Sequence, residues 1–174
     1  PELANLIFER LGLLRSKRKI FISYARMDSR AIAMQLREQL TACWYQVFLD
    51  THAIQPGVKF QDALMHELSD SDMVILLDSP NIANRPWVME EVAFADQMGL
   101  GTLQVVWPGQ RRTKQAELFE PYFLKDDPFE NPNDAGEEQL LQAAELDQII
   151  KQVYRQRNRA FEKRELRMIG RVKD

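Results

Sequence analysis

The sequence predicts an α/β fold in which a parallel β-sheet of four to five strands is flanked by helices. Short runs of Ile, Leu, Val, Met and Phe alternate along the chain with stretches whose apolar residues recur at helical spacing. The connections are short, and the apolar runs lack the polar alternation of a sheet that has one face in water. Together these observations are typical of parallel strands covered by helices on both faces.

Composition narrows the class of protein. With 174 residues, of which 45% are hydrophobic, the chain suits one domain with a real core plus a helical extension. A formal net charge of −3 gives no reason to expect a nucleic-acid partner. No apolar run approaches the roughly 20 residues of a membrane span, and no signal peptide is visible at the start. The single cysteine, Cys43, excludes an internal disulfide, so we expect a cytoplasmic protein.

The first elements are predicted as strand, helix and strand. A strand at 19–24 is followed by a helix at 29–43, for which Asp28 is the expected N-cap. The second strand spans 46–49 and ends at Asp50. The helix between them carries an apolar row at four-residue spacing, formed by Ile32, Leu36 and Leu40.

The same alternation continues through the next part of the chain. Pro56-Gly57 favours a turn after the second strand. A proline, Pro86, stands where a helix commonly begins. The expected elements are a helix at 58–69, a strand at 72–77, a helix at 86–98, a strand at 102–107 and a fifth strand near 122–124.

Helical extensions are predicted on both sides of a central domain at 18–135. Residues 1–17 place apolar side chains on one face of a helix, at Leu3, Leu6, Ile7, Leu11 and Leu14. After a loop rich in Pro and Asn at 126–136, a long helix is expected within 136–174, with apolar positions at Leu140, Leu141, Ala144, Ile149 and Val153. Its basic run, 155–173, is interpreted as a solvated face, with an acidic partner surface or RNA as the alternative.

The residues that follow the strands predict a ligand site. In an open parallel sheet, ligands bind outside the carboxyl ends of the strands, where the winding reverses. The residues at or near that edge are polar and aromatic, whereas the strands behind them are apolar. They are Ser23, Tyr24, Arg26, Asp50, Asp78, Ser79, Trp87, Glu91 and Trp107.

Several chemistries lack the residues they need. No Gly-rich phosphate loop is present, so a P-loop nucleotidase or a Rossmann dehydrogenase is unsupported. His52 and His66 have no metal-ligand spacing with Cys43, so no metal is expected. A serine nucleophile elbow is missing as well. A response-regulator receiver shares the layout, but it needs adjacent acids after the first strand, where this chain has Tyr, Ala and Arg.

Three motifs, in order over roughly residues 18–110, resemble those of Toll/interleukin-1 receptor (TIR) domains. They are FISYAR at 21–26 followed by Asp28, VFLD at 47–50 leading into Pro56-Gly57 and Lys59-Phe60, and LLDSP at 76–80 followed by WVMEE at 87–91. The resemblance implies a flavodoxin-like TIR fold, here with extra N- and C-terminal helices.

The resemblance also implies an activity. The enzymatic branch of the family, which cleaves NAD⁺, carries a glutamate four positions after a tryptophan, and Trp87 and Glu91 meet this pattern. Glu91 is therefore expected to be the essential carboxylate, and Phe60 corresponds to an aromatic residue that lines the site. Ala25-Arg26 stands where an enzymatic relative has two arginines, so the contacts of the first arginine are not carried over.

The expected chemistry needs few groups. Nicotinamide leaves NAD⁺ as a neutral molecule from a cationic precursor, so the pair of carboxylates common in glycoside hydrolysis is not required. One carboxylate can hydrogen-bond the ribose hydroxyls and face the developing positive charge. NAD⁺ is the substrate, and no cofactor is expected. The expected substrate-binding residues are Tyr24, Arg26, Asp50, Phe60, Ser79 and Trp87, of which Arg26 suits the diphosphate.

Each assignment has a structural alternative. Glu91 lies in the first turn of a predicted helix, where the helix dipole stabilises an acid by about 0.3–1 kcal/mol. The aromatic residues can be packing residues. Arg26 can pair with Asp28 or Asp50, and Ser79 can make a loop hydrogen bond.

The resemblance leads to the hypothesis of a TIR NAD⁺ glycohydrolase, or a cyclase that makes a cyclic ADP-ribose isomer as a signal. The expected setting is immune or cell-death signalling, such as antiviral defence by a prokaryotic immune effector. The resemblance also implies activation by self-assembly through TIR–TIR contacts that involve the Pro56-Gly57 loop. The helices at the two ends suggest a sensor domain or a partner protein. The alternatives are an enzymatically silent TIR adaptor and, more distantly, a base-exchanging glycosyl enzyme.

Overall fold

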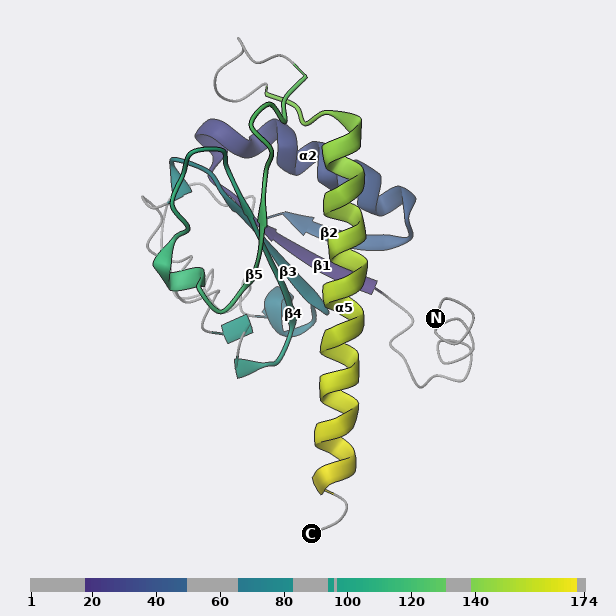
Figure 1. Ribbon diagram of the computed structural model, residues 1–174. Helices are drawn as coiled ribbons and strands as arrows, with labels where there is room; N and C mark the ends of the chain where they lie inside the picture. Colours follow the sequence, from purple (N-terminus) through teal and green to yellow (C-terminus); the bar gives the residue numbers. More distant parts are fainter. Residues whose placement is uncertain (1–17, 50–65, 83–93, 96, 131–138, 172–174) are drawn as a thin grey trace.

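The computed structural model describes residues 18–49, 66–82, 94–95, 97–130 and 139–171 of the chain (Figure 1). Five strands form one sheet: β1 (Arg18–Ser23), β2 (Tyr45–Leu49), β3 (Met73–Asp78), β4 (Gly101–Val106) and β5 (Glu120–Phe123). Every pairing in the sheet is parallel, and the strand order is β2-β1-β3-β4-β5. This is the flavodoxin-like doubly wound order, so the predicted fold class is confirmed, including the fifth strand.

The central strands are largely apolar because both faces of the sheet are buried. In β3, Met73, Ile75 and Leu77 pack into one core cluster, whereas Val74 and Leu76 pack into a second cluster on the other face. A strand with two buried faces cannot alternate between apolar and polar residues, which explains the uniform runs in the sequence.

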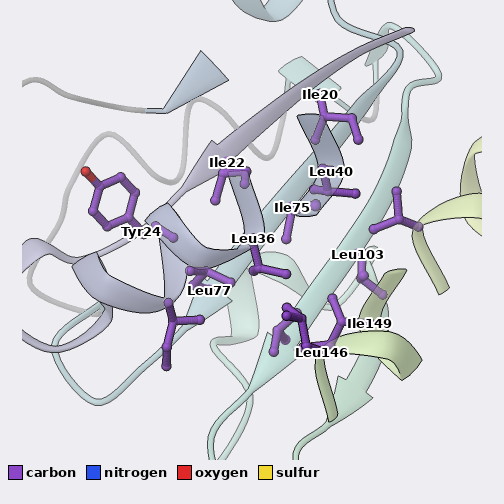
Figure 2. Close-up of a cluster of buried hydrophobic side chains, with 14 of the residues drawn as sticks. Ile20, Ile22, Tyr24, Leu36, Leu40, Ile75, Leu77, Leu103, Leu146 and Ile149 are labelled. Atoms are coloured by element: carbon purple, nitrogen blue, oxygen red, sulfur yellow. The ribbon is translucent and has the colours of Figure 1, made fainter. Parts of the chain in front are cut away.

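Two long helices cover the same face of the sheet. Helix α2 (Arg26–Ala42) contributes its buried row to the first cluster, and α5 (Ala143–Arg171) contributes residues from its first half (Figure 2). The side chains shared between these layers include Ile32, Leu36, Leu40, Leu146, Ile149 and Val153. In Figure 1, α5 crosses the sheet and continues past it toward the C-terminus.

On the opposite face, the second cluster draws on short pieces of chain. Leu68, Ala95 and Phe119 pack there against β1 and β3. Residues 66–69, 94–95 and 97 are helical, in agreement with the helices predicted at 58–69 and 86–98. The remaining residues of those two helices, and the N-terminal helix predicted at 1–17, lie outside the described residues.

Helix α2 begins at Arg26, three residues before the predicted start, and Asp28 is not its N-cap. The N-cap is Ala25, whose side chain makes no capping bond. Asp28 lies in the first turn and accepts hydrogen bonds from Ser79 and Asn81 instead. The N-cap prediction was wrong because the carboxylate has long-range donors that local spacing does not reveal.

Helix α5 begins at Ala143, later than the predicted start near residue 137. The chain just before it is extended, because its backbone groups are bound elsewhere. Leu141 pairs with Phe129 in an antiparallel bridge, and its N–H and C=O both bind the Gln35 side chain of α2 at 3.0 and 2.9 Å. The carbonyl of Leu140 accepts from the Glu130 N–H. These bonds replace those a helix would make.

The basic run of α5 is not uniformly solvated. Arg157 is only 2% exposed and lies over the Phe161 ring, with 4.6 Å between its Cζ atom and the ring centroid. Its guanidinium is 3.9 Å from the buried carboxylate of Asp72. Arg155 and Arg159 are exposed, as the solvated-face interpretation expects.

The edge strand β5 is short and contains Pro121. The Leu124 N–H donates to the Val106 carbonyl of β4, so alternate residues of β5 direct their N–H groups toward β4. Pro121 belongs to the other set, whose backbone nitrogens face outward. In the described part of the chain, no helix has the length and apolar character needed to cross a membrane.

Candidate functional site

The carboxyl edge of the sheet gathers polar groups from three adjacent strands. Ser23 ends β1, Asp78 ends β3, and Trp107 follows β4. Register brings them together, since Ser23 pairs with Leu76 and Asp78 pairs with Val106. The first turn of α2 starts at the same edge. The predicted site therefore has a physical location, although only part of it lies in the described residues.

Three of the seven predicted site residues lie in the described part of the chain. They are Tyr24, Arg26 and Ser79. The other four, Asp50, Phe60, Trp87 and Glu91, lie outside the described residues, so their roles stay predictions. Trp87 and Glu91 belong to the segment that begins directly after Ile82.

Asp28 joins the start of α2 to the loop that follows β3. One carboxylate oxygen, Oδ1, accepts a hydrogen bond from the Ser79 hydroxyl at 2.6 Å. The other, Oδ2, accepts from the backbone N–H and the side-chain amide of Asn81, both at 2.9 Å. Ser79 is fully buried, so in this conformation its hydroxyl is engaged within the protein. Its expected contact with substrate stays a prediction.

A second carboxylate network lies beside the first and holds the loop after β4. Asp78 is fully buried, and its oxygens accept from the Gln104 amide at 2.7 Å and from the N–H and hydroxyl of Thr113 at 2.8 and 2.6 Å. The Gln110 amide adds a longer bond of 3.3 Å. Arg112 donates to the Gln104 oxygen at 2.7 Å and so fixes the orientation of that amide. With its oxygens occupied in this way, Asp78 is a structural group.

Tyr24 and Arg26 differ in burial. The ring of Tyr24 belongs to the first core cluster beside Ile22 and Leu77, and it is 3% exposed (Figure 2). Arg26 is half-buried at the first position of α2, and among the described residues no hydrogen bond or ion pair engages its side chain. The pairing of Arg26 with Asp28 that we considered as an alternative is not present. Its expected contact with the diphosphate of the substrate stays a prediction.

The Ser23 hydroxyl is a further polar group at this edge. It is 1% exposed and finds no hydrogen-bond partner among the described residues. Buried hydroxyls normally have a partner. Ser23 lies on the face of the sheet that carries Phe21 and Ala25, opposite the face covered by α2 and α5.

The described carboxylates at the edge bind groups of the protein itself. Within the described ranges, no group of three or more His, Cys, Asp or Glu side chains is arranged to hold a metal ion. The carboxylates of Asp28 and Asp78 are directed at hydrogen-bond donors of the protein. In the described part of the chain, both carboxylates are therefore occupied within the protein.

Sequence reasoning missed five residues that organise the edge. Asn81, Gln104, Gln110, Arg112 and Thr113 were not singled out, because amide, hydroxyl and arginine side chains carry no periodic signal. Their bonds connect positions far apart in the sequence: Thr113 and Asp78 are separated by 35 residues, and Asn81 and Asp28 by 53. An alignment of loop residues would be the means of finding them.

Comparison with known proteins places the chain in a family. The TIR domain family matches residues 20–141. A search of curated proteins finds no match. Among solved structures, the chain is similar to the TIR domains in a structure of the activated Roq1 resistosome directly recognising the pathogen effector XopQ, with 20% identity and a TM-score of 0.46. That match covers 54% of this chain and 60% of the other. Because the family match spans most of the chain, and the sheet has the flavodoxin-like order, the protein belongs to the TIR domain family.

Proposed function

We propose that this TIR domain is an NAD⁺ glycohydrolase that cleaves the bond between nicotinamide and ribose, with Glu91 as the essential carboxylate. The observation that carries the proposal is that the TIR match at 20–141 contains Trp87 and Glu91 at the spacing found in the NAD⁺-cleaving branch. A domain that acts only by assembling has no need of this pair.

The arrangement of the carboxyl edge supports the proposal. Arg26 stands at the start of α2 with no partner among the described residues, which suits the diphosphate of NAD⁺. The loop that leads toward Trp87 and Glu91 starts at this edge, directly after β3. The start of α2 and the beginning of the loop that leads to Glu91 lie at the same end of the sheet, and we propose that Arg26 and Glu91 belong to one site there.

The chemistry proposed for Glu91 is electrostatic. When the glycosidic bond breaks, positive charge develops on the ribose ring while nicotinamide leaves as a neutral molecule. A carboxylate fixed beside the ribose stabilises that charge, and removal of one such group commonly lowers kcat by about 10²- to 10³-fold. Water then captures the ring carbon in a hydrolase, whereas the adenine ring captures it in a cyclase.

Assembly is part of the proposal. We propose that copies of the domain associate through TIR–TIR contacts that involve the Pro56-Gly57 loop, and that this association activates cleavage in immune or cell-death signalling. A cytoplasmic setting and a prokaryotic immune effector fit this function. The test therefore has to be made at protein concentrations that permit association.

The experiment follows free nicotinamide released from NAD⁺ by the purified full chain at high concentration, with and without a crowding agent. Glu91→Gln, which keeps the size of the side chain and removes its charge, is expected to lower release at least 100-fold. Glu90→Gln is the matched control, because it removes the neighbouring acid, and it is expected to keep most of the activity.

The products separate the remaining alternatives. ADP-ribose identifies a hydrolase, a cyclic isomer identifies a cyclase, and exchange of added free base identifies a base-exchanging enzyme. If the wild-type chain releases no nicotinamide under any of these conditions, or if Glu91→Gln is as active as the wild type, the catalytic proposal is wrong. A TIR adaptor then remains.

A further inference from the structure

We propose that Asp28 is a positioning residue, which holds the loop Ser79–Ile82 against the first turn of α2 and thereby fixes where the chain enters the segment that carries Trp87 and Glu91. Its effect on catalysis rests on the proposed function. Its effect on the loop does not, and the experiment below separates the two.

The geometry of the contact suits a carboxylate. Three donors converge on the two oxygens of Asp28: the Ser79 hydroxyl at 2.6 Å, the Asn81 N–H at 2.9 Å and the Asn81 amide at 2.9 Å. An ionised carboxylate is an acceptor at every position, so it can satisfy all three at once. Hydrogen bonds to a charged acceptor are stronger than those between neutral groups.

The helix supports the carboxylate from its other side. Asp28 lies in the first turn of α2, where the partial positive charge of the helix N-terminus stabilises an anion. The adjacent Ser29 donates its hydroxyl back to the Ala25 carbonyl at 2.6 Å and lies 3.5 Å from the Ser79 hydroxyl. The first turn of α2 therefore favours an anion at this position and is itself closed by a local hydrogen bond.

The loop itself is compact between Asp28 and the core. The Ile82 N–H donates to the Ser79 carbonyl at 3.0 Å, which closes a turn over residues 79–82. The Ile82 side chain is buried in the second core cluster. One end of the turn is thus held by a charge-assisted network, and the other by apolar packing.

This arrangement links two parts of the proposed site. Arg26 precedes Asp28 by two positions on the same helical turn, whereas Trp87 and Glu91 follow Ile82 by five and nine positions. Helix α2 carries Arg26, the residue proposed to bind the diphosphate of NAD⁺. The Asp28 contact connects this helix to the loop that leads to the proposed catalytic carboxylate. Since a displacement of about 1 Å can cost roughly 10²-fold in rate, this tie is expected to affect turnover.

A structural role alone would predict a different pattern. If Asp28 only stabilises the fold, its removal lowers the free energy of unfolding and the fraction of active enzyme, but the folded enzyme keeps its kcat. If Asp28 positions the loop, kcat of the folded enzyme falls while KM changes little, because Arg26 and the other substrate contacts remain.

The experiment compares Asp28→Ala, Asp28→Asn and Ser79→Ala with Glu38→Ala, which removes an exposed acid of the same helix. For each full-length variant, kcat and KM for nicotinamide release are measured beside hydrogen–deuterium exchange of peptides covering residues 79–93. Urea unfolding establishes that each variant is folded under the assay conditions.

We expect Asp28→Ala to lower kcat about 10- to 100-fold with KM within about threefold of the wild type, and to speed exchange in 79–93. In Asp28→Asn, the side-chain oxygen can still accept hydrogen bonds from Asn81, and the side-chain amide can donate to the Ser79 hydroxyl. The kcat of this variant and its exchange rate in 79–93 are therefore expected to stay close to those of the wild type. Ser79→Ala removes one of three bonds and is expected to be intermediate. Glu38→Ala should match the wild type.

The outcomes are distinguishable. Unchanged exchange in Asp28→Ala overturns the inference, and faster exchange with unchanged kcat overturns the positioning role in catalysis. If the wild-type chain releases no nicotinamide, the proposed function fails, but exchange still decides whether Asp28 holds the loop. If Asp28→Ala does not fold, Ser79→Ala, which removes the bond to Asp28 Oδ1, provides the same two readouts.

Discussion

The buried carboxylate of Asp78 gives the sharpest prediction about stability. Its four hydrogen bonds come from three residues of β4 and of the loop after it, Gln104, Gln110 and Thr113. We expect Asp78→Ala to detach residues 110–113 from the sheet edge and to destabilise the whole domain. Asp78→Asn is the informative companion, since it keeps the volume and removes only the charge.

The magnitude follows from the donors that lose their acceptor. Each bond to a charged group contributes about 1.5–3 kcal/mol, and each buried donor left unsatisfied costs about 1–3 kcal/mol. These values overlap rather than add, and water can enter the space left by the side chain. Asp78→Ala is therefore expected to lower the free energy of unfolding by roughly 3–5 kcal/mol. This is a large part of the roughly 5–15 kcal/mol that ordinarily stabilises a domain.

Asp78→Asn is expected to lower the free energy of unfolding by only about 1–2 kcal/mol. The asparagine oxygen can occupy the Oδ2 position and still accept from Gln104 and from the Thr113 N–H. Its amide then faces the Thr113 hydroxyl, which can rotate and accept. Gln104 cannot flip to help, because Arg112 holds its oxygen.

The assay is equilibrium urea unfolding followed by far-ultraviolet circular dichroism, with Asp126→Ala as a control at an exposed acid. The control is expected to stay within about 0.5 kcal/mol of the wild type. The reasoning is refuted if Asp78→Ala also stays within about 1 kcal/mol, or if Asp78→Asn is at least as destabilising as Asp78→Ala.

Two further predictions concern other parts of the fold. A Cβ atom at Gly101 would lie 3.2 Å from the Gln156 carbonyl of α5, so Gly101→Ala is expected to push α5 from β4 and to cost about 1–2 kcal/mol; a thermal midpoint equal to that of the wild type would contradict this close approach. Burial raises the pKa of the Tyr45 hydroxyl from 10 to about 12, so the folded protein keeps a proton that the unfolded chain loses. The stability that this provides is complete below pH 10 and is lost as the pH rises toward 12, by about 1.4 kcal/mol at pH 11. Tyr45→Phe should therefore narrow the difference in unfolding free energy between pH 8 and about pH 11 by that amount, whereas an unchanged difference would argue against the raised pKa.

The sheet could be predicted because its signals are local. Strand β3 is apolar from Met73 to Leu77, and β1 and β4 carry apolar residues at most of their buried positions, because both faces of the sheet are buried. The row Ile32, Leu36 and Leu40 likewise marked the buried face of α2, and all three side chains are fully buried. Residues that only need to be apolar at the correct period are visible in a single sequence.

The predictions that were wrong have long-range causes. Asp28 has the sequence of an N-cap, but its donors are 51 and 53 residues away in the chain. Leu140 and Leu141 have helical spacing with Ile149 and Val153, yet the chain at Leu141 is held extended by Gln35, 106 residues earlier. Hydrogen bonds between loops and distant side chains depend on the finished fold, and periodicity contains no trace of them.

For the candidate site, the structure bears on its location and on three of its predicted residues, while their roles stay predictions. Topology alone brings the ends of β1, β3 and β4 to one edge, which is why Arg26 and Ser79 could be assigned to it from the sequence. The burial of Ser79 and the unpaired state of Arg26 among the described residues required the structure. Whether a side chain at an edge faces a ligand or another loop is decided by packing.

The proline of β5 has a consequence for how copies of this domain can meet. An open sheet edge invites a further strand, because a row of free N–H and C=O groups acts as a template. Here the outward row of a four-residue strand lacks a donor at Pro121 and retains one at Phe123. A ladder cannot be continued across such a gap, so growth of the sheet from one molecule into the next is disfavoured on this side. Fibre-like stacking of copies along β5 is therefore disfavoured, and any association of copies through this side has to use contacts other than strand pairing.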